Sequence, residues 1–512
     1  MSNDDNGYVR GIDRTQELLL PKTVDEYIDS ENPVRFVDAF VDSLDMDHLG
    51  FKHSKPNDVG RPPYSPKDIL KLYVHGYLKH MRSSRVLEEA CNTNLETIWL
   101  MKGLAPDFKT ISDFRKDNAD TIKKVFKEFV LICRQLDLFG AELVGIDGAK
   151  IKAVNSKERN FDEEKLDQKL KHIDEKVSEY MKQLEENADV DVKKTNHLGR
   201  SGVDSTADPA STTVGTTKEK LKQKISELGE RKKQYEEILG RLKQSGEEQI
   251  SLTDPESRLM KNNQKIEVCF NTEVSVDSKF HLVPDYYVTN DETDRNQLSK
   301  ASIGAKDALE AESLDVAADK GFFDSLELKE CIQNGIIPYV PEKKGSRAAP
   351  KNKNVPEPPF YEDKFAYDKM SDTYICPAGE TLVFSSWVRN KNHSGMVYKL
   401  YKTKACSYCS FRSRCTGNKL GRFIYRWENE EILEELRTLV DSPEGREIVW
   451  KRKELVEHVF GTIKRSFNMP FFLLKGLKKV NCEMGFTLLA YNMRRAINIL
   501  GTSLLLGFLA AT

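Results

Sequence analysis

The feature that most constrains the fold of this chain of 512 residues is an alternation of apolar and polar side chains that begins at Lys265. Successive side chains of a β-strand point to opposite faces, so this pattern predicts one long bent strand or a strand pair with a single apolar face. A polar turn at residues 277–279 and a further strand follow. The apolar face comprises Ile266, Val268, Phe270, Thr272, Val274 and Val276.

Short apolar runs on both sides of this stretch predict further strands. One begins at Leu143, and others cover residues 313–319 and 336–341, with a helical segment at 301–312 between strands. The resulting order, β-β-β-α-β-α-β followed by a later helix, is typical of a mixed α/β sheet. We therefore expect an α/β fold with helices flanking the sheet.

Two segments between the first strand and the long alternation have apolar residues in steps of four and three. That spacing predicts two heptad helices, separated by a linker rich in Ser, Thr, Asp, Gly and Asn at about 187–217. We interpret them as an antiparallel helical hairpin inserted at 161–255. Its role is open: it could serve dimerisation or DNA contact, or be a solvated structural arm. The stripes are Leu166, Leu170, Ile173, Val177, Tyr180 and Leu184, then Leu221, Ile225, Leu228, Lys232, Tyr235, Leu239 and Leu242.

The N-terminal part, residues 1–138, is predicted to be helical. Asn32 and Pro33 open an apolar stripe, Ser65 and Pro66 form a helix start, and Ser83 is expected to cap a further helix. Several short capped helices fit a DNA-binding module of the helix-turn-helix kind, and they fit an ordinary all-α packing domain equally well.

Positive charge is concentrated in two segments, although the formal net charge is only −2. Residues 381–426 contain ten Lys or Arg and no Asp or Glu, and residues 445–480 contain nine Lys or Arg against three Glu. Such segments favour a polyanion-binding face, but a basic surface alone is not diagnostic.

The nine cysteines suggest a reducing compartment, because their number is odd and the polar, acidic first residues show no secretion signal. Cys376, Cys406, Cys409 and Cys415 have spacings that suit a tetrahedral zinc site closed by four thiolates, within a basic insertion at 346–430. Four unrelated cysteines in a reduced protein are the alternative. The other five are expected in the core: Cys91, Cys133, Cys269, Cys331 and Cys482.

The C-terminal apolar stretch, residues 497–511, is short for a membrane span, so we expect no membrane association. It suits a helix that is buried or faces a partner.

Three acidic residues are candidates for metal-dependent chemistry. Asp147 and Asp319 end short apolar runs and face away from the apolar side of each strand, and Glu457 lies on a basic amphipathic helix at about 442–465. If the two strands are neighbours, their carboxylates could share a cation, and Mg²⁺ needs only one or two carboxylates per ion. Trp450 and Lys464, each seven residues from Glu457, would share its helix face. The alternatives are turn or cap aspartates and an ordinary solvated helix face.

Four segments together resemble bacterial insertion-sequence transposases of the DDE type: GIDGAK, VTNDETDRNQL, VAADKGFF and VEHVFGTIKR. The C-terminal signature of one large group, Tyr-x2-Arg-x3-Glu-x6-Lys, falls on Trp450, Lys453, Glu457 and Lys464. Trp replaces Tyr and Lys replaces Arg, and the neighbouring Arg452 is available for the arginine's role. The resemblance extends from about Asp13 to Leu500 and includes the helical N-terminal part.

The resemblance implies an RNase H-like catalytic core at 139–160 and 256–345, completed by the catalytic helix and closing helices at 431–512. It implies that Asp147, Asp319 and Glu457 bind two Mg²⁺ or Mn²⁺ ions. Cleavage at terminal inverted repeats and strand transfer into target DNA would follow, in a bacterial homodimer acting at the cytoplasmic nucleoid. The residues expected to contact double-stranded DNA are Lys464, Arg465, Lys453, Arg452 and Trp450. A catalytically inactive DNA-binding regulator and a metal-dependent nuclease are the competing hypotheses.

Overall fold

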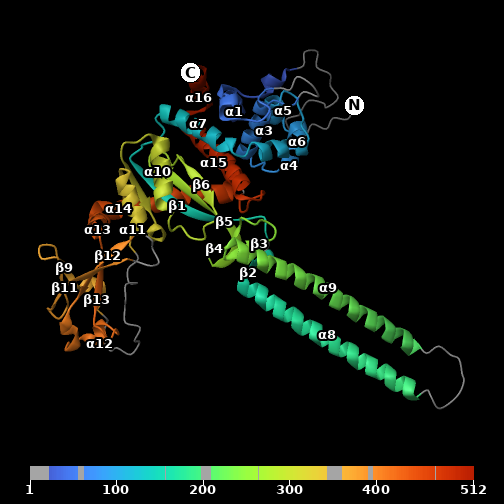
Figure 1. Cartoon of the computed structure of the whole chain (residues 1–512). Helices are drawn as coiled ribbons and strands as arrows, with labels where there is room; N and C mark the ends of the chain where they lie inside the picture. Colours follow the sequence, from blue (N-terminus) through green and yellow to red (C-terminus); the bar gives the residue numbers. More distant parts are fainter. Residues whose placement is uncertain are drawn as a thin grey trace, which may run out of the picture. The chain divides into compact units, whose positions relative to one another are not determined.

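The structure is a computed structural model that describes residues 22–55, 63–155, 157–197, 209–262, 264–342, 360–389, 396–467 and 469–511. The chain divides into two compact units (Figure 1). The first comprises Met1–Leu138, Gly461–Met469 and Asn481–Thr512, and the second comprises Phe139–Phe460 and Pro470–Val480. The acidic first residues, on which the absence of a secretion signal was inferred, lie outside the described part.

Short capped helices build the first unit, as the sequence predicts. The Asn32 side chain accepts a hydrogen bond from the Val34 amide, and the Ser65 side chain accepts one from the Lys67 amide. Ser83 occupies the N-cap position of its helix without a side-chain cap bond. The helices are α1 (Pro33–Ser43), α2 (Met46–Leu49), α3 (Pro66–Leu78), α4 (Ser84–Thr93), α5 (Leu95–Leu100), α6 (Phe108–Asp117) and α7 (Thr121–Gln135).

C-terminal residues complete this helical unit. They belong to α15 (Leu477–Leu500), from Asn481 onward, and to α16 (Thr502–Ala511). The Phe486 ring stacks on Tyr73 and Tyr77 at centroid distances of 5.0 and 5.2 Å. Arg82 forms a buried ion pair with Glu483 at 2.6 Å. The segment that the sequence analysis groups with the catalytic helix thus contributes to the core of the N-terminal helices.

No described helix combines the length and the apolar character that a membrane span needs.

A mixed six-stranded sheet forms the centre of the second unit, which confirms the α/β class. Its main path runs β4-β5-β1-β7-β8, and β6 also pairs with β5. β1 is antiparallel to β5 and parallel to β7. The alternating stretch is one continuous strand, β5, while β4 was not predicted. The strands are β1 (Leu143–Lys152), β4 (Arg258–Asn262), β5 (Lys265–Asp277), β6 (Tyr286–Thr289), β7 (Leu314–Ala318) and β8 (Ile336–Tyr339).

Two helices alternate with strands of this sheet along the chain: α10 (Leu298–Leu309) precedes β7, and α11 (Ser325–Gln333) precedes β8. A third helix, α14 (Pro443–Gly461), comes later in the chain and packs on β1. The Ser275 hydroxyl of β5 donates a hydrogen bond to the Ala301 carbonyl of α10, so α10 packs on the polar side of β5. That side is buried together with the apolar one, since every residue from Val268 to Asp277 is buried.

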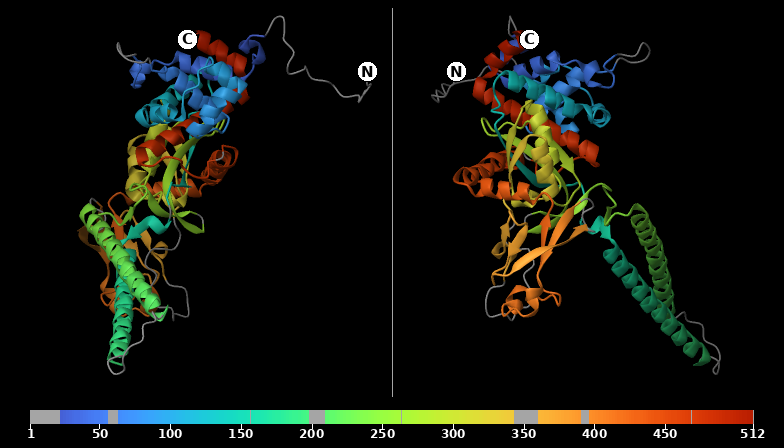
Figure 2. Two further views of the ribbon diagram at one scale, coloured as in Figure 1. Left: turned by 90° about the vertical axis from the view of Figure 1, so that its right-hand side faces the viewer. Right: turned by 60° about the vertical axis from the view of Figure 1, so that its left-hand side comes forward.

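The predicted helical hairpin is present, and its helices are longer than expected. α8 (Glu163–His197) and α9 (Pro209–Ser245) lie side by side and leave the core at a small sheet of β2 (Asn160–Asp162) and β3 (Gln249–Ser251) (Figures 1 and 2). Much of the predicted linker is therefore helical, and residues 198–208 lie outside the described part. Lys232, the polar interruption of the second stripe, pairs with Asp174 at 2.6 Å across the two helices.

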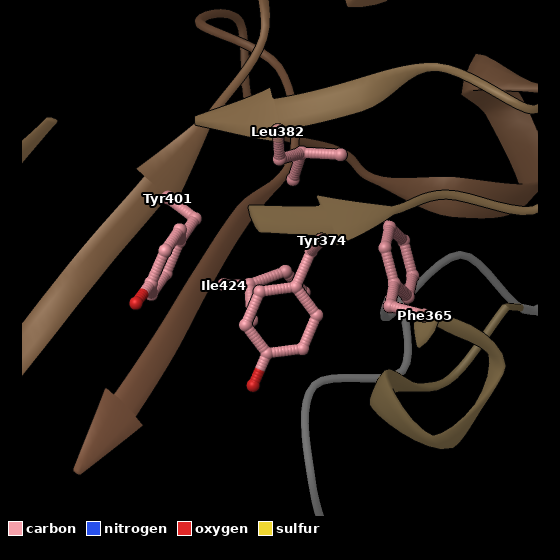
Figure 3. Close-up of a cluster of buried hydrophobic side chains, with 5 residues drawn as sticks. All are labelled: Phe365, Tyr374, Leu382, Tyr401 and Ile424. Atoms are coloured by element: carbon pink, nitrogen blue, oxygen red, sulfur yellow. The ribbon is translucent and has the colours of Figure 1, made fainter. Parts of the chain in front are cut away.

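A five-stranded antiparallel sheet carries the basic cysteine segment. It is ordered β13-β12-β11-β10-β9 and encloses a small core of Phe365, Tyr374, Leu382, Tyr401 and Ile424 (Figure 3). Its strands are β9 (Ala366–Asp368), β10 (Thr373–Ile375), β11 (Thr381–Arg389), β12 (Val397–Lys402) and β13 (Phe423–Trp427).

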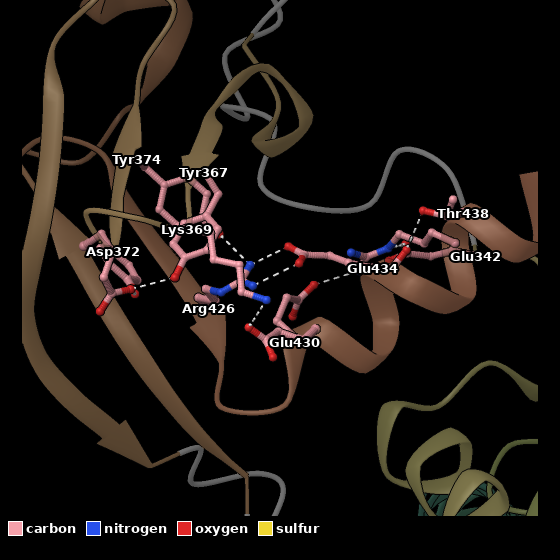
Figure 4. A network of polar contacts seen from close by, with 12 residues as sticks. Glu342, Tyr367, Lys369, Asp372, Tyr374, Arg426, Glu430, Glu434 and Thr438 are labelled. Carbon is pink, nitrogen blue, oxygen red and sulfur yellow. Dashed lines mark hydrogen bonds and ion pairs between the residues drawn. The ribbon is translucent and has the colours of Figure 1, made fainter.

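Polar contacts fix this sheet internally and to α13 (Glu430–Asp441) (Figure 4). Asp372 accepts hydrogen bonds from the hydroxyls of Tyr367 and Tyr401 and from Lys399, at 2.7, 2.6 and 2.8 Å. Partial burial of Asp372 opposes their effect, but these donors prevail and lower its pKa to about 2. Arg426 of β13 donates to both carboxylate oxygens of Glu434 in α13, at 2.5 and 3.0 Å.

Candidate active site

The two predicted catalytic aspartates lie on neighbouring parallel strands. The pairing of β1 with β7 ends at Ile146 opposite Ala318; Asp147 is the next residue of β1, and Asp319 directly follows β7. Each carboxylate accepts a hydrogen bond from the amide of the residue that follows it, Gly148 at 3.0 Å and Lys320 at 2.8 Å. The register therefore brings Asp147 and Asp319 to the same edge of the sheet, as the sequence analysis expected for neighbouring strands.

The carboxylate of Asp147 has a basic neighbour and acidic ones. The Arg452 guanidinium of α14 lies 3.2 Å from Oδ2 of Asp147, and Arg452 is buried. Burial raises the pKa of Asp147; Arg452 opposes this increase, and the negative charges of Asp294 and Asp319 add to it. Arg452 Nη1 makes no hydrogen bond with any described residue, so its interaction with Asp147 is electrostatic attraction between neighbouring opposite charges.

Helix α14 packs directly on β1 because residue 145 is a glycine. A β-carbon at Gly145 would lie 3.2 Å from Val456 and 3.3 Å from Leu455. Glu457, next in sequence, is exposed and makes no hydrogen bond or ion pair with any residue that the structure describes. Trp450, on the same helix, is also exposed.

The regular spacing that aligned Trp450, Glu457 and Lys464 does not continue through the helix. α14 ends at Gly461, and a π-helical turn, Thr462–Ser466, contains Lys464 and Arg465. A π turn has i→i+5 hydrogen bonds and more residues per turn than an α-helix. The shared face predicted for Lys464 assumed α-helical geometry, but the α-helix ends before Lys464. Trp450 and Glu457 both lie within α14, whereas Lys464 lies beyond its end, and the predicted role of Lys464 stays a prediction.

The described part of the chain contains no group of three or more His, Cys, Asp or Glu side chains arranged to hold a metal ion. Asp147 and Asp319 are adjacent, but Glu457 does not join them in a formed metal site. The assignment of all three as metal ligands stays a prediction.

A polar cluster that the sequence pattern did not predict lies beside Asp147. Asp294, in the loop before α10, accepts hydrogen bonds on Oδ1 from Lys150 at 2.5 Å and from Asn271 at 2.9 Å. Asn271 also donates to Glu273 Oε1 at 2.7 Å. Burial raises the pKa of Glu273 well above its ordinary value, and the charge of Asp294 acts in the same direction. Asp294 falls within the quoted VTNDETDRNQL segment, which was the only sequence signal for it.

The alternating pattern of β5 did not identify Glu273 as a residue of the site. Glu273 alternates with the apolar residues of β5, and polar residues at alternate positions usually face solvent. Here α10 packs on that side of β5, and Glu273 is completely buried.

The four cysteines of the predicted zinc site line one cavity of about 30 Å³. Burial raises the pKa of the Cys415 thiol to about 11; Arg422 opposes this, and Cys406, Cys376 and Cys409 contribute to the increase. The thiols are therefore neighbours, although no three of them form a closed metal group in the described part. The other five cysteines are buried, as predicted.

Comparison with known proteins gives two family matches. A model described as "Transposase DDE domain" matches residues 375–497, which include the cysteine cavity and α14. A model described as "Transposase domain (DUF772)" matches residues 22–117, within the helical first unit. No curated protein and no solved structure matches the chain. Along the chain the DUF772 match precedes the DDE match, and together the two transposase domains support an insertion-sequence DDE transposase.

Proposed function

We propose that this transposase is a metal-dependent enzyme that cleaves DNA strands at terminal inverted repeats and joins the freed 3′ ends to target DNA. The observation that carries the proposal is the register of β1 and β7, which brings Asp147 and Asp319 to one edge of the sheet beneath α14. Two neighbouring carboxylates, one of them paired with Arg452 of α14, suit the RNase H-like core that the family resemblance implies.

The donor set fits Mg²⁺ or Mn²⁺, because both ions prefer oxygen ligands and retain water at the remaining positions. Asp147 and Asp319 would provide the shared carboxylates, and Glu457 would complete the set from α14. When bound, a pair of such ions activates an attacking oxygen and stabilises a leaving one in an in-line displacement.

The protein's own residues would prepare this site and hold DNA. Arg452 provides a counter-charge for the partly buried carboxylate of Asp147. Lys453 and Trp450 are exposed on α14, and Lys464 and Arg465 follow in the π-helical turn, so we propose that these residues contact DNA phosphates.

The helical first unit would bind the terminal repeats of the element. A homodimer would bring the two ends together, and the site of action would be the bacterial nucleoid in the cytoplasm.

A strand-cleavage and joining assay tests the proposal. The donor plasmid carries the DNA that flanks the gene, and joined products are detected with Mg²⁺ or Mn²⁺ present. Asp147→Asn, Asp319→Asn and Glu457→Gln should each abolish cleavage and leave binding of the repeats intact. Asp315→Asn on β7 and Glu454→Gln on α14 are the matched controls and should remain active. Full cleavage by both aspartate variants would refute the catalytic assignment.

The same assay separates the competing functions. A nuclease would cleave but would not join a 3′-OH end to target DNA. A DNA-binding regulator would bind the repeats and show neither reaction with any divalent metal.

We also propose that Cys376, Cys406, Cys409 and Cys415 hold one structural Zn²⁺. Support comes from the cavity that all four thiols line, whose volume of about 30 Å³ suits a single ion, and from the preference of zinc for four thiolates. Elemental analysis of the purified full chain should find one zinc per chain, and Cys409→Ser should lose it. Ser407→Ala, in the same turn, should retain zinc. A zinc-free wild-type protein prepared under reducing conditions with added zinc would overturn this assignment.

A further inference from the structure

A single carboxylate, that of Asp294, reaches the backbone beside both catalytic aspartates. A β-carbon placed on Gly148, the residue after Asp147, would lie 2.6 Å from Asp294 Oδ1. A β-carbon placed on Gly321, two residues after Asp319, would lie 3.6 Å from Asp294 Oδ2. The two oxygens of Asp294 therefore lie across the ends of the paired segments of β1 and β7, where glycines leave room for them.

The two oxygens of Asp294 have different surroundings. Oδ1 is anchored by Lys150 at 2.5 Å and by Asn271 at 2.9 Å. Oδ2 accepts no hydrogen bond from any residue that the structure describes. A carboxylate with one oxygen fixed and the other unpaired has the arrangement of a pre-oriented metal ligand, because its supporting contacts hold its direction.

A second observation is that the same cluster contains a buried oxygen without a hydrogen-bond partner among the described residues. Glu273 is completely buried, and its Oε2 atom has no hydrogen-bond partner among the described residues. That oxygen lies 3.0 Å from the β-carbon position of Gly148, beside Asp294. Buried polar atoms are nearly always satisfied in folded proteins, so a buried oxygen without a partner among the described residues is a place that suits a cation or a hydrogen-bond donor.

A cavity of about 570 Å³ opens onto Asp294. Lys150, Lys261, Arg295 and Gly321 are among its lining residues. It provides a path along which a hydrated cation could reach the carboxylate.

We propose that Asp294 is a further ligand of the divalent cation that Asp147 and Asp319 hold, with Lys150 and Asn271 as positioning residues that fix its direction. This inference rests on the proposed function. The ligand class is a hard divalent cation, Mg²⁺ or Mn²⁺. The competing explanation is that Asp294 only neutralises Lys150, as a structural ion pair.

Binding of Mn²⁺ to the metal-free full chain, followed by electron paramagnetic resonance, separates these explanations without relying on activity. Asp294→Asn should weaken Mn²⁺ binding by at least about 10-fold, because loss of a residue that only supports a metal ligand already costs about 10–100-fold. Asp324→Asn is the control, because Asp324 lines the same cavity and pairs with Arg295. The double variant Lys150→Met with Asp294→Asn should bind as weakly as Asp294→Asn alone. Restored binding in the double variant, or unchanged binding in Asp294→Asn, would overturn the proposal.

Two further arms keep the outcome interpretable. Asp147→Asn should also lose Mn²⁺ binding. If the wild type binds no Mn²⁺, the proposed function fails together with the inference. If Asp147→Asn loses Mn²⁺ binding and Asp294→Asn keeps it, only the assignment of Asp294 as a ligand is rejected. If Asp294→Asn does not fold, Fe²⁺-generated hydroxyl radicals can locate the ion in the wild type. Backbone cleavage is expected near residues 147, 294 and 319, and its absence near 294 would reject Asp294 as a ligand.

Discussion

Gly148→Ala is the most direct test of the polar cluster beside Asp147. The new methyl group would lie 2.6 Å from Asp294 Oδ1 and 2.9 and 3.0 Å from the two oxygens of Glu273. Ordinary contact begins at 3.4 Å, so Oδ1 must retreat by about 0.8 Å. It cannot do so while keeping its contacts with Lys150 and Asn271. Glu273 is fully buried, so its side chain cannot turn into solvent.

Overpacking of this kind costs roughly 1–3 kcal/mol. We therefore expect Gly148→Ala to destabilise the second unit by that amount in urea denaturation, and to weaken Mn²⁺ binding because Asp294 is displaced. Gly240→Ala is the matched control: nothing lies within 4 Å of its β-carbon position in α9, and alanine there should stabilise the helix by about 0.5–1 kcal/mol. A Gly148→Ala protein with wild-type stability and wild-type Mn²⁺ affinity would show that the cluster is not packed as described.

Three further perturbations have defined outcomes. Arg82→Met removes the guanidinium that pairs with the buried Glu483 and should destabilise the helical unit by roughly 3–5 kcal/mol in urea denaturation. Arg85 is exposed on α4, so Arg85→Met should change little, and equal effects of the two substitutions would count against the ion pair. The pKa of Asp372 is lowered from 3.8 to about 2, so its contribution to stability is present above pH 4 and lost as the pH falls toward 2. Acid titration of thermal stability should show that loss in the wild type and a smaller one in Asp372→Asn; parallel profiles would contradict the network. Gly145→Val should push α14 away from β1, cost about 1–3 kcal/mol and impair DNA cleavage more than Mn²⁺ binding; unimpaired cleavage would mean that α14 does not need its contact with β1.

Local patterns predicted much of the secondary structure. The alternation after Lys265 required a strand, and that strand is β5. Asn32 and Ser65 form the caps that their positions indicated, because an N-cap depends only on neighbouring residues. The family also followed from short segments, since the matched transposase domains agree with the resemblance.

The candidate site was only partly predictable. Asp147 and Asp319 could be recognised because each ends an apolar run, but their adjacency depended on the register of β1 with β7. Glu457 was placed on its helix correctly, whereas its relation to the aspartates depends on the packing of α14, which the sequence pattern does not specify.

By itself, the sequence determined the strands, the capped helices, the heptad hairpin and the three acidic candidates, because each depends on the spacing of nearby residues. Only the tertiary structure decided that α10 covers the polar side of β5, that Asp294 reaches the glycines beside both aspartates, and that Phe486 packs with Tyr73. These contacts join residues far apart in the chain. Their geometry follows from how whole elements pack, which no local spacing encodes.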